Sequence, residues 1–598
     1  MLPLLRRWVL FCFVASLAII TAFRYCNTLT WHTRPLTASD LQHPGLLQAR
    51  VRWKDIPQRF PVETYIPLPT GSPAAIPRIQ HKFEPETDAR KSARQIRLNT
   101  VRKSFVHSWE GYKQHAWLQD EVTPLSGTYN NGFGGWGATL VDTLDTLWIM
   151  GLKKEFVVAV AALKKINFSS TTLDTVNVFE TTIRYLGGFL SAYDISGGKY
   201  PALLEKAVEL GEMLYVAFDT PNRMPVTRWD WKNAALRGPQ EADSHALVAE
   251  IGSLSLEFTR LSQLSGDHKY YDAVQRISDV FEDQQNKTKI PGIWPVMLNA
   301  REGDFTRDRT FTFGGMADSL YEYLPKQHLL LGGRTDQNRR MYDGALAAAK
   351  QHIFYRPMNL NNKQILLAGT TQRNSADNIR LDPEGQHLAC FTGGMVALAA
   401  RVFDRPEDME TARQLVDGCI WAYESMPTGI MPESFHTVAC TDHRDCEWDE
   451  MAWFKGVAEK QQHVLSGPKL AWEDVAQKYI KEMSLAPGFT DIGDRRYILR
   501  PEAIESLFIL YRITGDTTLQ DSAWKMFQAI DTHTKTDIAH AALDDVTNKH
   551  TSQADSMESF WTAETLKYFY LIFSEPDVVS LDEYVFNTEA HPLLRPKV

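Results

Sequence analysis

The chain contains none of several short motifs that identify common classes of enzyme. It has no H-E-x-x-H zinc motif, no phosphate-binding loop ending in Gly-Lys-Ser/Thr and no G-x-S-x-G nucleophile turn. Residues Gly132–Gly137 match G-x-G-x-x-G, but no apolar strand precedes them, so they do not indicate a dinucleotide site. The usual zinc-protease, nucleotide-hydrolase, serine-hydrolase and dehydrogenase sites are therefore not predicted.

Basic residues are also fewer than acidic residues. The 598 residues include 64 Lys and Arg against 73 Asp and Glu, which gives a net charge of −9. No long run of like charge appears, whereas a nucleic-acid-binding protein would usually carry a basic face. A nucleic-acid partner is therefore not predicted. Apolar residues make up 44% of the chain and include 16 Trp, which is enough to bury a large core.

Cysteine is rare, with six residues in the whole chain. Cys390 and Cys419, 29 positions apart, lie where a disulfide could join two helices. Cys440 and Cys446 bracket a short loop, and their pairing stays open at this point. Disulfides would indicate an oxidising compartment, with which two Asn-x-Ser/Thr glycosylation sequons are compatible.

Long apolar runs are almost absent, apart from one at the N-terminus. Arg6 and Arg7 precede the uncharged run Trp8–Phe23, which is short for a membrane span but fits a signal anchor. Positive charge before the run favours a cytosolic N-terminus and a luminal remainder. We therefore expect residues 1–26 to form a cytosolic tail and a single-pass signal anchor.

A proline-rich stretch follows the predicted anchor. Residues 27–88 contain many prolines and no periodic apolar pattern, which is typical of a semi-extended linker. A helical apolar pattern begins near Ala89. The sequence thus predicts a luminal stalk over 27–88 and one catalytic domain over 89–598.

The predicted catalytic domain is built almost entirely of helices. Seven segments share a small-residue or glycine-rich entry followed by an amphipathic run, and strand-like alternation is scarce. Roughly one further helix fits between successive segments, as in a closed ring of inner and outer helices, although a generic helical array would also fit. The segments are Gly132–Met150, Phe179–Tyr193, His245–Leu261, Phe313–Leu330, His387–Val402, Tyr497–Arg512 and Ser556–Leu571.

Acidic residues gather at the starts of these segments. Each of them alone is more often a solvated surface residue than a catalytic one. In a ring, however, such helix starts converge at one mouth, where paired carboxylates suit glycoside hydrolysis and oxygen ligands suit a hard cation such as calcium. The residues are Glu180, Glu250, Asp318, Glu502, Glu505, Glu558 and Glu564.

Several of these segments carry motifs of a known family. Over roughly Ala89–Pro592 the chain resembles the class I α-1,2-mannosidases of glycoside hydrolase family 47. The resemblance implies an all-α (α/α)7 barrel and the removal of mannose from N-linked high-mannose glycans. The matching motifs are Val178–Gly188, Ala317–Tyr323, Leu499–Glu502 with Glu505, and Phe586–Pro592.

The resemblance also implies the catalytic groups. Glu180 would be the general acid, acting through a water molecule, and Glu502 the general base. Asp318 would be a third essential carboxylate and an alternative acid. The expected outcome is inversion of the anomeric configuration, because a water molecule must fit between the sugar and the base.

A calcium ion and a set of sugar-binding residues complete the implied site. Thr588 would bind Ca2+ directly, and Glu505, Glu564 and Glu589 would hold it through water. Phe560 would stack under the mannose ring. The other substrate-binding residues would be Arg184, Glu250, Met316, His387, Arg500, Glu564 and Glu589.

Met316 departs from the endoplasmic-reticulum subgroup, which has Arg at this position. The departure predicts removal of several mannoses rather than one. The alternative function is that of a mannosidase-like degradation factor that recognises misfolded glycoproteins. Those relatives lack cysteines matching Cys390 and Cys419, so the resemblance favours a disulfide here and a processing enzyme.

Overall fold

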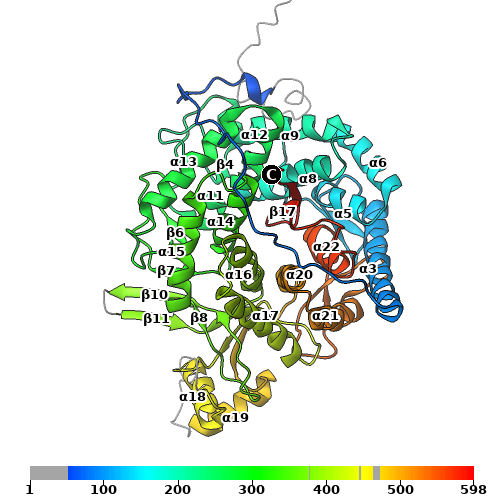
Figure 1. Ribbon diagram of the computed structural model, residues 1–598, viewed down its shortest axis with the longest axis vertical. Helices are drawn as coiled ribbons and strands as arrows, with labels where there is room; N and C mark the ends of the chain where they lie inside the picture. Colours follow the sequence, from blue (N-terminus) through cyan, green and yellow to red (C-terminus); the bar gives the residue numbers. More distant parts are fainter. Residues whose placement is uncertain (1–50, 376–377, 443–445, 462–471, 598) are drawn as a thin grey trace, which may run out of the picture.

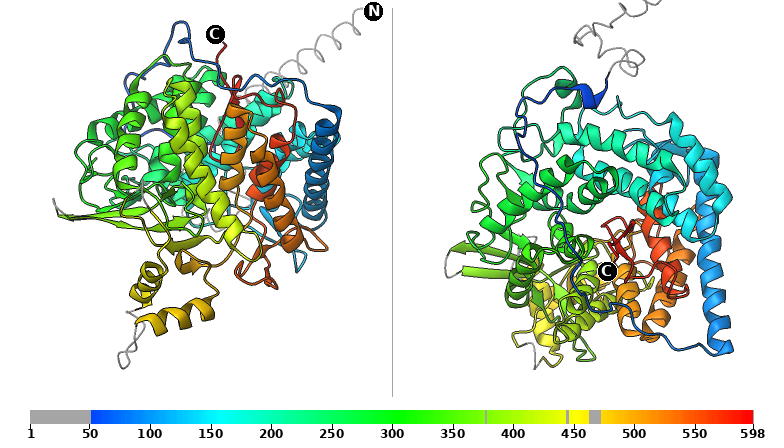
Figure 2. Two further views of the ribbon diagram at one scale, coloured as in Figure 1. Left: turned by 60° about the horizontal axis from the view of Figure 1, so that its bottom comes forward. Right: turned by 45° about the horizontal axis from the view of Figure 1, so that its top comes forward.

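Two rings of helices, one inside the other, make up most of the protein (Figures 1 and 2). The computed structural model describes residues 51–375, 378–442, 446–461 and 472–597. Within these residues, seven inner helices alternate along the chain with seven outer ones, and each inner helix packs on its outer neighbour. The inner helices are α5 (Leu144–Ile149), α8 (Gly187–Ile195), α12 (Ser255–Ser265), α14 (Asp318–Leu330), α16 (Phe391–Val402), α20 (Glu502–Thr514) and α22 (Leu566–Ile572). The outer helices are α3 (Asp88–His115), α6 (Lys153–Ala162), α9 (Pro201–Val216), α13 (His268–Gln284), α15 (Gln337–His352), α17 (Asp408–Ser425) and α21 (Thr518–Thr534).

The outer helix α3 closes the ring, because it packs against α22 at the other end of the chain. The predicted (α/α)7 barrel is therefore confirmed, and all seven predicted segments contribute inner helices. Two glycines allow the inner helices to approach closely. A Cβ atom on Gly188 would lie 2.8 Å from the Val141 carbonyl oxygen, and one on Gly394 would lie 3.0 Å from the Ser506 Cα atom.

Short helical turns lead into several inner helices. Two of them are π-helical, Thr181–Leu186 before α8 and Trp561–Thr565 before α22, and both adjoin predicted site residues. Such turns are rare and occur often at functional sites. The remaining short helices are α4 (Ala138–Asp142), α7 (Val178–Glu180), α10 (Trp231–Ala235), α11 (Val248–Gly252) and the 3-10 turns Trp53–Asp55, Leu163–Lys165 and Leu388–Cys390.

Small antiparallel sheets lie between the helices, and the sequence did not predict them. Two of them lead into inner helices: β3, paired with β4, leads through α7 to α8, and β12, paired with β13, precedes α16. The strands are β1 (Glu121–Thr123), β2 (Thr128–Asn130), β3 (Val176–Asn177), β4 (Arg228–Trp229), β5 (Ala246–Leu247), β6 (Met297–Leu298), β7 (Thr310–Thr312), β8 (Phe354–Tyr355), β9 (Leu367–Ala368), β10 (Thr370–Ser375), β11 (Asn378–Asp382), β12 (Glu384–Gln386), β13 (Ser434–Thr437), β14 (Phe489–Asp494), β15 (Ala542–Leu543), β16 (Gln553–Ala554), β17 (Tyr584–Phe586) and β18 (Pro592–Leu594).

The C-terminal hairpin β17–β18 lies inside the ring, near the centre of Figure 1. Its register pairs Phe586 with Pro592, so the residues between them form the connecting turn. A buried charge cluster holds this turn. His591 contacts Asp145 at 2.7 Å and Asp142 at 3.0 Å, and Lys567 contacts Asp145 at 2.8 Å.

Two elements project from the barrel in Figure 1. The hairpin β10–β11 extends to one side, and the helices α18 (Glu450–Gln461) and α19 (Trp472–Met483) pack together below the barrel. Helix α18 also packs against β14, which connects this pair to the sheet β12–β13–β14.

Residues 51–87 differ from the expected stalk. They run along one face of the barrel, seen in front in Figure 1, and bury Trp53 and Ile79. Backbone hydrogen bonds attach the segment where inner helices end: His81 donates to Arg512 of α20 and Ala74 to Gly332, just after α14. Proline composition indicated an extended chain correctly, but it gave no sign that the extended chain lies on the barrel.

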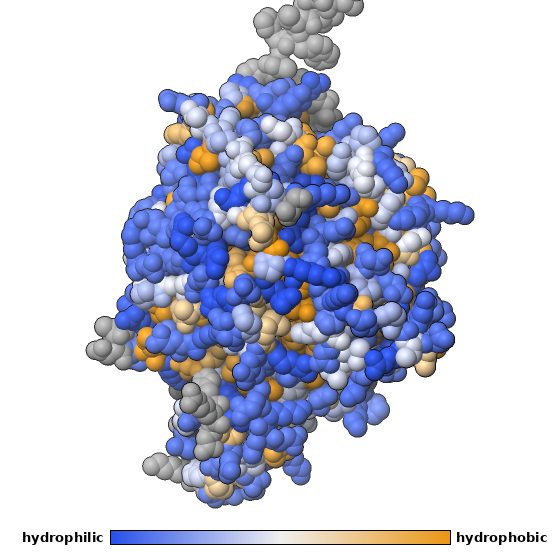
Figure 3. Space-filling model, viewed as in Figure 1, coloured by the Kyte–Doolittle hydropathy of each residue, from blue (hydrophilic) through white to orange (hydrophobic). Residues whose placement is uncertain are grey.

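The same face is mostly hydrophilic in its described residues, with small scattered apolar patches (Figure 3). The predicted signal anchor, with Cys12 and Cys26, lies outside the described residues. Among the residues that are described, no helix is long and apolar enough to cross a membrane.

The four cysteines that lie in the described part of the chain form two disulfides. Cys390 and Cys419 join the start of α16 to the outer helix α17, with Cα atoms 6.0 Å apart, which confirms the predicted pairing. Cys440 and Cys446 close the short loop between β13 and α18.

Candidate active site

The predicted acidic residues lie at the N-terminal ends of inner helices. Asp318 is the first residue of α14, and Glu502 is the first residue of α20. Residues 51–87 attach at the opposite, C-terminal ends of α14 and α20. The two ends of the barrel are therefore distinct, one closed by the N-terminal segment and one lined by carboxylates.

Glu502 is held in its charged form. Its Oε2 atom lies 2.8 Å from His387 Nδ1, and Arg500 Nη1 lies 3.6 Å from its Oε1 atom. Burial opposes ionisation of the Glu502 carboxyl, but the hydrogen bond from His387 and the charge of Arg500 prevail and lower its pKa below the usual value. Leu499, just before this group, has a φ of 71°, a strained backbone conformation of the kind that clusters at functional sites.

The pKa of Asp318, in contrast, is shifted upward. Burial, opposed by a hydrogen bond from the Ser319 amide and reinforced by the charges of Glu322 and Glu502, raises the pKa of Asp318 to about 7. Two carboxyl groups near each other thus differ in the pH at which they ionise. Asp318 can keep a proton near neutral pH while Glu502 remains an acceptor, which is the arrangement that general acid–base catalysis needs.

Glu180 belongs to a chain of alternating charges. Arg184, one turn along the same helix, places Nε 2.9 Å from the Glu180 carboxylate and Nη1 2.9 Å from the Glu589 carboxylate. The Arg184 guanidinium also lies 5.8 Å from the Phe560 ring centroid. The structure therefore brings Glu180, Arg184, Phe560 and Glu589 together from three separate parts of the sequence.

The predicted calcium ligands form a buried acidic cluster. Glu505, Glu564 and Glu589 are each at most 6% exposed. Burial and the charges of neighbouring carboxylates raise the pKa of each of them, to about 8 for Glu505 and Glu589. A divalent cation beside the three groups would relieve both effects. Thr588 lies within this region, in the turn of the β17–β18 hairpin.

The spacing of this cluster limits how a cation could be bound. Within the described part of the chain, no three His, Cys, Asp or Glu side chains are close enough to ligate a metal ion directly. The assignment of Thr588 as the direct ligand, with the carboxylates acting through water, therefore stays a prediction. The donor set, all oxygen, fits calcium.

Glu250 and Met316 lie on adjacent segments at the rim of the carboxylate-lined end of the barrel. The Ala249 amide donates to the Met316 carbonyl oxygen at 3.1 Å. Glu250 is paired with Arg228 of β4 at 2.6 Å, and Arg228 is half-exposed. Met316 is 59% exposed and has a φ of 74°, so its side chain projects from a strained turn into solvent.

Comparisons with known proteins agree with this geometry. The model of Glycosyl hydrolase family 47 matches residues 104–595. The chain belongs to this family. It is 34% identical to the endoplasmic reticulum mannosyl-oligosaccharide 1,2-alpha-mannosidase of Mus musculus over 83% of this chain and 68% of that protein. It is 33% identical to mannosyl-oligosaccharide alpha-1,2-mannosidase 1B of Aspergillus phoenicis over 88% of this chain and 97% of that protein.

A solved structure gives the same result. The alpha-1,2-mannosidase from Trichoderma reesei superimposes with a TM-score of 0.72 at 29% identity, covering 84% of this chain and 99% of that chain. The family 47 chain described here is therefore a glycoside hydrolase of the α-1,2-mannosidase group, as the resemblance implied. Its helical barrel is shared with that structure.

Sequence reasoning missed several residues that support this family 47 site. Arg228 sits on a two-residue strand, too short to give a pattern. Lys326 is buried between Glu322 and Glu505, and His591 is buried between two aspartates. A lone charged residue within an apolar run was the available signal for Lys326 and His591. Tyr423, which contacts His387, lies on an outer helix and gave no signal.

Proposed function

We propose that this enzyme is a calcium-dependent, inverting exo-α-1,2-mannosidase that trims N-linked high-mannose glycans in the secretory pathway. The observation that carries the proposal is the pair Asp318 and Glu502, whose pKa values are shifted in opposite directions. An N-terminal anchor over residues 1–26 would hold the catalytic domain in the lumen of the Golgi or endoplasmic reticulum. The names of the relatives support the substrate class.

Glu502 is the proposed general base. Its carboxylate is ionised and oriented by His387 and Arg500, so it can accept a proton from an attacking water molecule. That water approaches the anomeric carbon from the face opposite the leaving oxygen, which inverts the configuration. The released mannose is then the β anomer.

Proton donation to the leaving oxygen falls to Asp318 or Glu180. Asp318 retains its proton up to a pH of about 7, which supports it as the donor. Glu180, the donor implied by the family resemblance, is paired with Arg184 and would act through water. The two assignments are separable, because Asp318→Asn and Glu180→Gln should differ in their effects on the basic limb of the pH profile.

Calcium would be held by Thr588 and, through water, by Glu505, Glu564 and Glu589. When bound, the ion would orient mannose hydroxyls and neutralise part of the buried negative charge. Phe560 would offer its ring face to the sugar. The Arg184 guanidinium, which contacts both the Glu180 and the Glu589 carboxylates, would hold these two groups in place. His387 and Arg500 would keep Glu502 aimed at the water.

Met316 supports removal of several mannoses. A guanidinium at this position could donate directional hydrogen bonds to a neighbouring mannose and so select one branch. Methionine has no such donor and adapts to differently shaped branches. Its exposure at the rim leaves room for more than one branch orientation.

One assay tests the proposal as a whole. The described chain, from Val51 onward, is incubated with a nine-mannose glycan in calcium buffer and after exhaustive chelation. We expect sequential release towards the five-mannose product with calcium only. Tight glycan binding without mannose release would instead favour a degradation factor that recognises misfolded glycoproteins, although the Cys390–Cys419 disulfide supports a processing enzyme.

A further inference from the structure

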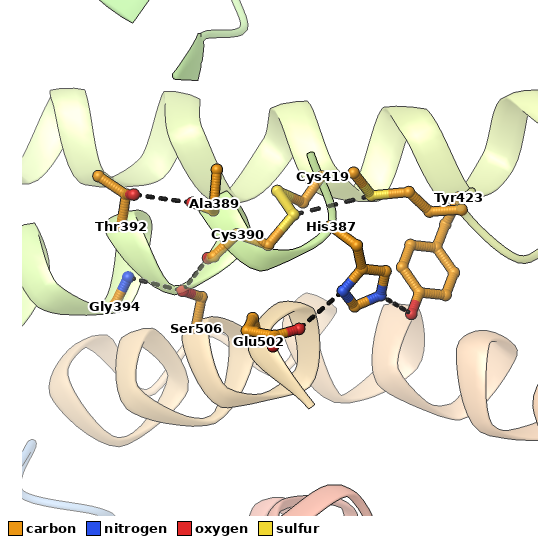
Figure 4. Close-up of a disulfide and its surroundings, with 10 residues drawn as sticks. His387, Ala389, Cys390, Thr392, Gly394, Cys419, Tyr423, Glu502 and Ser506 are labelled. Atoms are coloured by element: carbon orange, nitrogen blue, oxygen red, sulfur yellow. Dashed lines mark hydrogen bonds and ion pairs between the residues drawn. A yellow bond between two sulfur atoms is a disulfide. The ribbon is translucent and has the colours of Figure 1, made fainter. Parts of the chain in front are cut away.

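Tyr423 stands directly behind the proposed general base. Its hydroxyl oxygen lies 2.8 Å from His387 Nε2, and the other ring nitrogen, His387 Nδ1, lies 2.8 Å from the Glu502 carboxylate (Figure 4). His387 is completely buried, and Tyr423 is 3% exposed. The three side chains therefore form a continuous hydrogen-bonded chain from the outer helix α17 to the active site, of which His387 and Tyr423 are shielded from water.

With Glu502 ionised, a single direction of hydrogen bonding suits all three side chains. Burial, reinforced by the charges of Glu502 and Glu433, raises the pKa of Tyr423, so the phenol keeps its proton and can donate. Donation to Nε2 leaves the ring proton of His387 on Nδ1, where it faces the Glu502 carboxylate. A tyrosine that accepted instead would require a charged imidazole. The hydroxyl thus selects the tautomer that points a donor at the base.

A disulfide and two hydrogen bonds in the surrounding helices fix the distance between Tyr423 and His387. Cys390 lies one turn after His387, Cys419 lies one turn before Tyr423 on α17, and the two are joined by a disulfide (Figure 4). Ser506, one turn along α20 from Glu502, donates to the Cys390 carbonyl and accepts from the Gly394 amide. Helices α16, α17 and α20 are therefore joined around the hydrogen-bonded relay formed by Tyr423, His387 and Glu502.

We propose that Tyr423 is a positioning residue for hydrolysis, which holds His387 in the tautomer and orientation that keep Glu502 ready to accept a proton from water. The proposal rests on the assignment of Glu502 as the general base. Tyr423 lies behind His387 and does not reach the sugar. Loss of its hydroxyl should therefore reduce turnover without changing substrate binding.

The test compares Tyr423→Phe with Tyr342→Phe. Tyr342, on α15, is also buried, and its hydroxyl has no hydrogen-bond partner among the described residues, so the control removes a phenolic oxygen without breaking a contact. Supporting hydrogen bonds behind a functional side chain commonly account for about 10- to 100-fold in activity. We expect kcat of Tyr423→Phe to fall in that range with KM unchanged, while Tyr342→Phe keeps the wild-type kcat.

A double variant sharpens the test. Tyr423→Phe should add nothing to His387→Ala, because the hydroxyl acts only through the imidazole. An unchanged kcat, a change confined to KM or a full additional loss in the His387→Ala background would each overturn the proposal. Rates are expressed per folded molecule from denaturant unfolding of the same samples, and a loss that vanished after this correction would also overturn it.

Glu502→Gln, assayed in parallel, distinguishes failure of this proposal from failure of the assignment beneath it. If Glu502→Gln abolishes turnover and Tyr423→Phe does not reduce it, the base is correct and the relay is wrong. If Glu502→Gln itself turns over normally, the base lies elsewhere and the role of Tyr423 falls with it.

Discussion

At the scale of single residues, the site depends on the contrast between Glu502 and Asp318. The hydrogen bond from His387 and the charge of Arg500 outweigh burial and lower the pKa of Glu502, so the proposed base stays charged at neutral pH. The pKa of Asp318 is raised to about 7, so this acid is protonated below that pH and loses its proton above it. We expect kcat to fall as the pH rises through about 7. A profile for Asp318→Asn whose residual activity keeps the same basic limb would assign that limb to another group.

Substitution of the base gives a second prediction. Glu502→Gln keeps the size of the side chain and one acceptor oxygen but cannot take a proton from water. Loss of a general base commonly costs about 10²–10⁴ in rate. We expect such a loss in kcat, measured by mannose release, with glycan affinity largely retained in calorimetric titration. Near-normal turnover would contradict the assignment.

Met316→Arg tests specificity at the same scale. A guanidinium at the rim would restore a directional donor beside Glu250, so the product series should narrow towards removal of one mannose. Met451→Arg, on α18, makes the same change at another exposed methionine and should leave the products unchanged. If the wild-type enzyme in excess stalls after one mannose, the interpretation of Met316 is wrong.

The predictability of single residues followed their position in motifs. Glu180, Asp318, Glu502 and Thr588 were named from the sequence because they lie in long family motifs. Arg228, Lys326 and Tyr423 lie outside those motifs. His591 lies inside one, but its partners Asp142 and Asp145 come from a distant segment. Glu505, for example, meets Lys326 across 179 positions. Such contacts follow from the closed ring, which single-sequence patterns do not specify.

At the scale of elements, the two disulfides differ in the loops that they close. Cys390 and Cys419 are 29 positions apart, and Cys440 and Cys446 are six apart. A longer closed loop restricts the unfolded chain more, and a disulfide typically contributes about 2–4 kcal/mol to stability. We expect Cys390→Ala/Cys419→Ala to lower the free energy of unfolding by about this amount.

The matched control is Cys440→Ala/Cys446→Ala, which should lower it less. Equal losses in denaturant unfolding would show that loop length does not decide the effect. Peptide mapping without reduction provides an independent check, since free thiols at Cys390 and Cys419 would reject the pairing.

Helices were predicted well and strands were not. The inner helices are apolar and are introduced by glycine or small residues, so their 3.6-residue period is visible in the sequence. Most of the strands are two or three residues long, which is too short for an alternating pattern. These strands nevertheless position the site, because β3, paired with β4, leads into Glu180, and β12, paired with β13, leads into His387.

At the scale of the whole molecule, residues 51–87 belong to the catalytic domain. Trp53 and Ile79 are buried against the barrel, and burying one large apolar side chain contributes about 1.5–3 kcal/mol. Gln80 also accepts a hydrogen bond from the buried guanidinium of Arg512 at 3.0 Å. A chain that begins at Ala89 should therefore melt at a lower temperature than one that begins at Val51.

Differential scanning calorimetry of the two chains checks this expectation. The KM for the glycan serves as the control, because residues 51–87 attach at the end of the barrel opposite the carboxylates. Below the melting temperature of the shorter chain, both chains should have the same KM. Equal melting temperatures would mean that the segment contributes nothing to the folded domain.

The central claim is that water attacks mannose directly, with Glu502 as base, in a site that requires calcium. Proton NMR of a nine-mannose glycan during hydrolysis tests it most directly, because the anomeric signal of newly released mannose reports the stereochemistry before mutarotation. We predict that the β anomer appears first in calcium buffer and that no mannose appears after exhaustive chelation. Initial release of the α anomer, or undiminished release without calcium, would contradict the account.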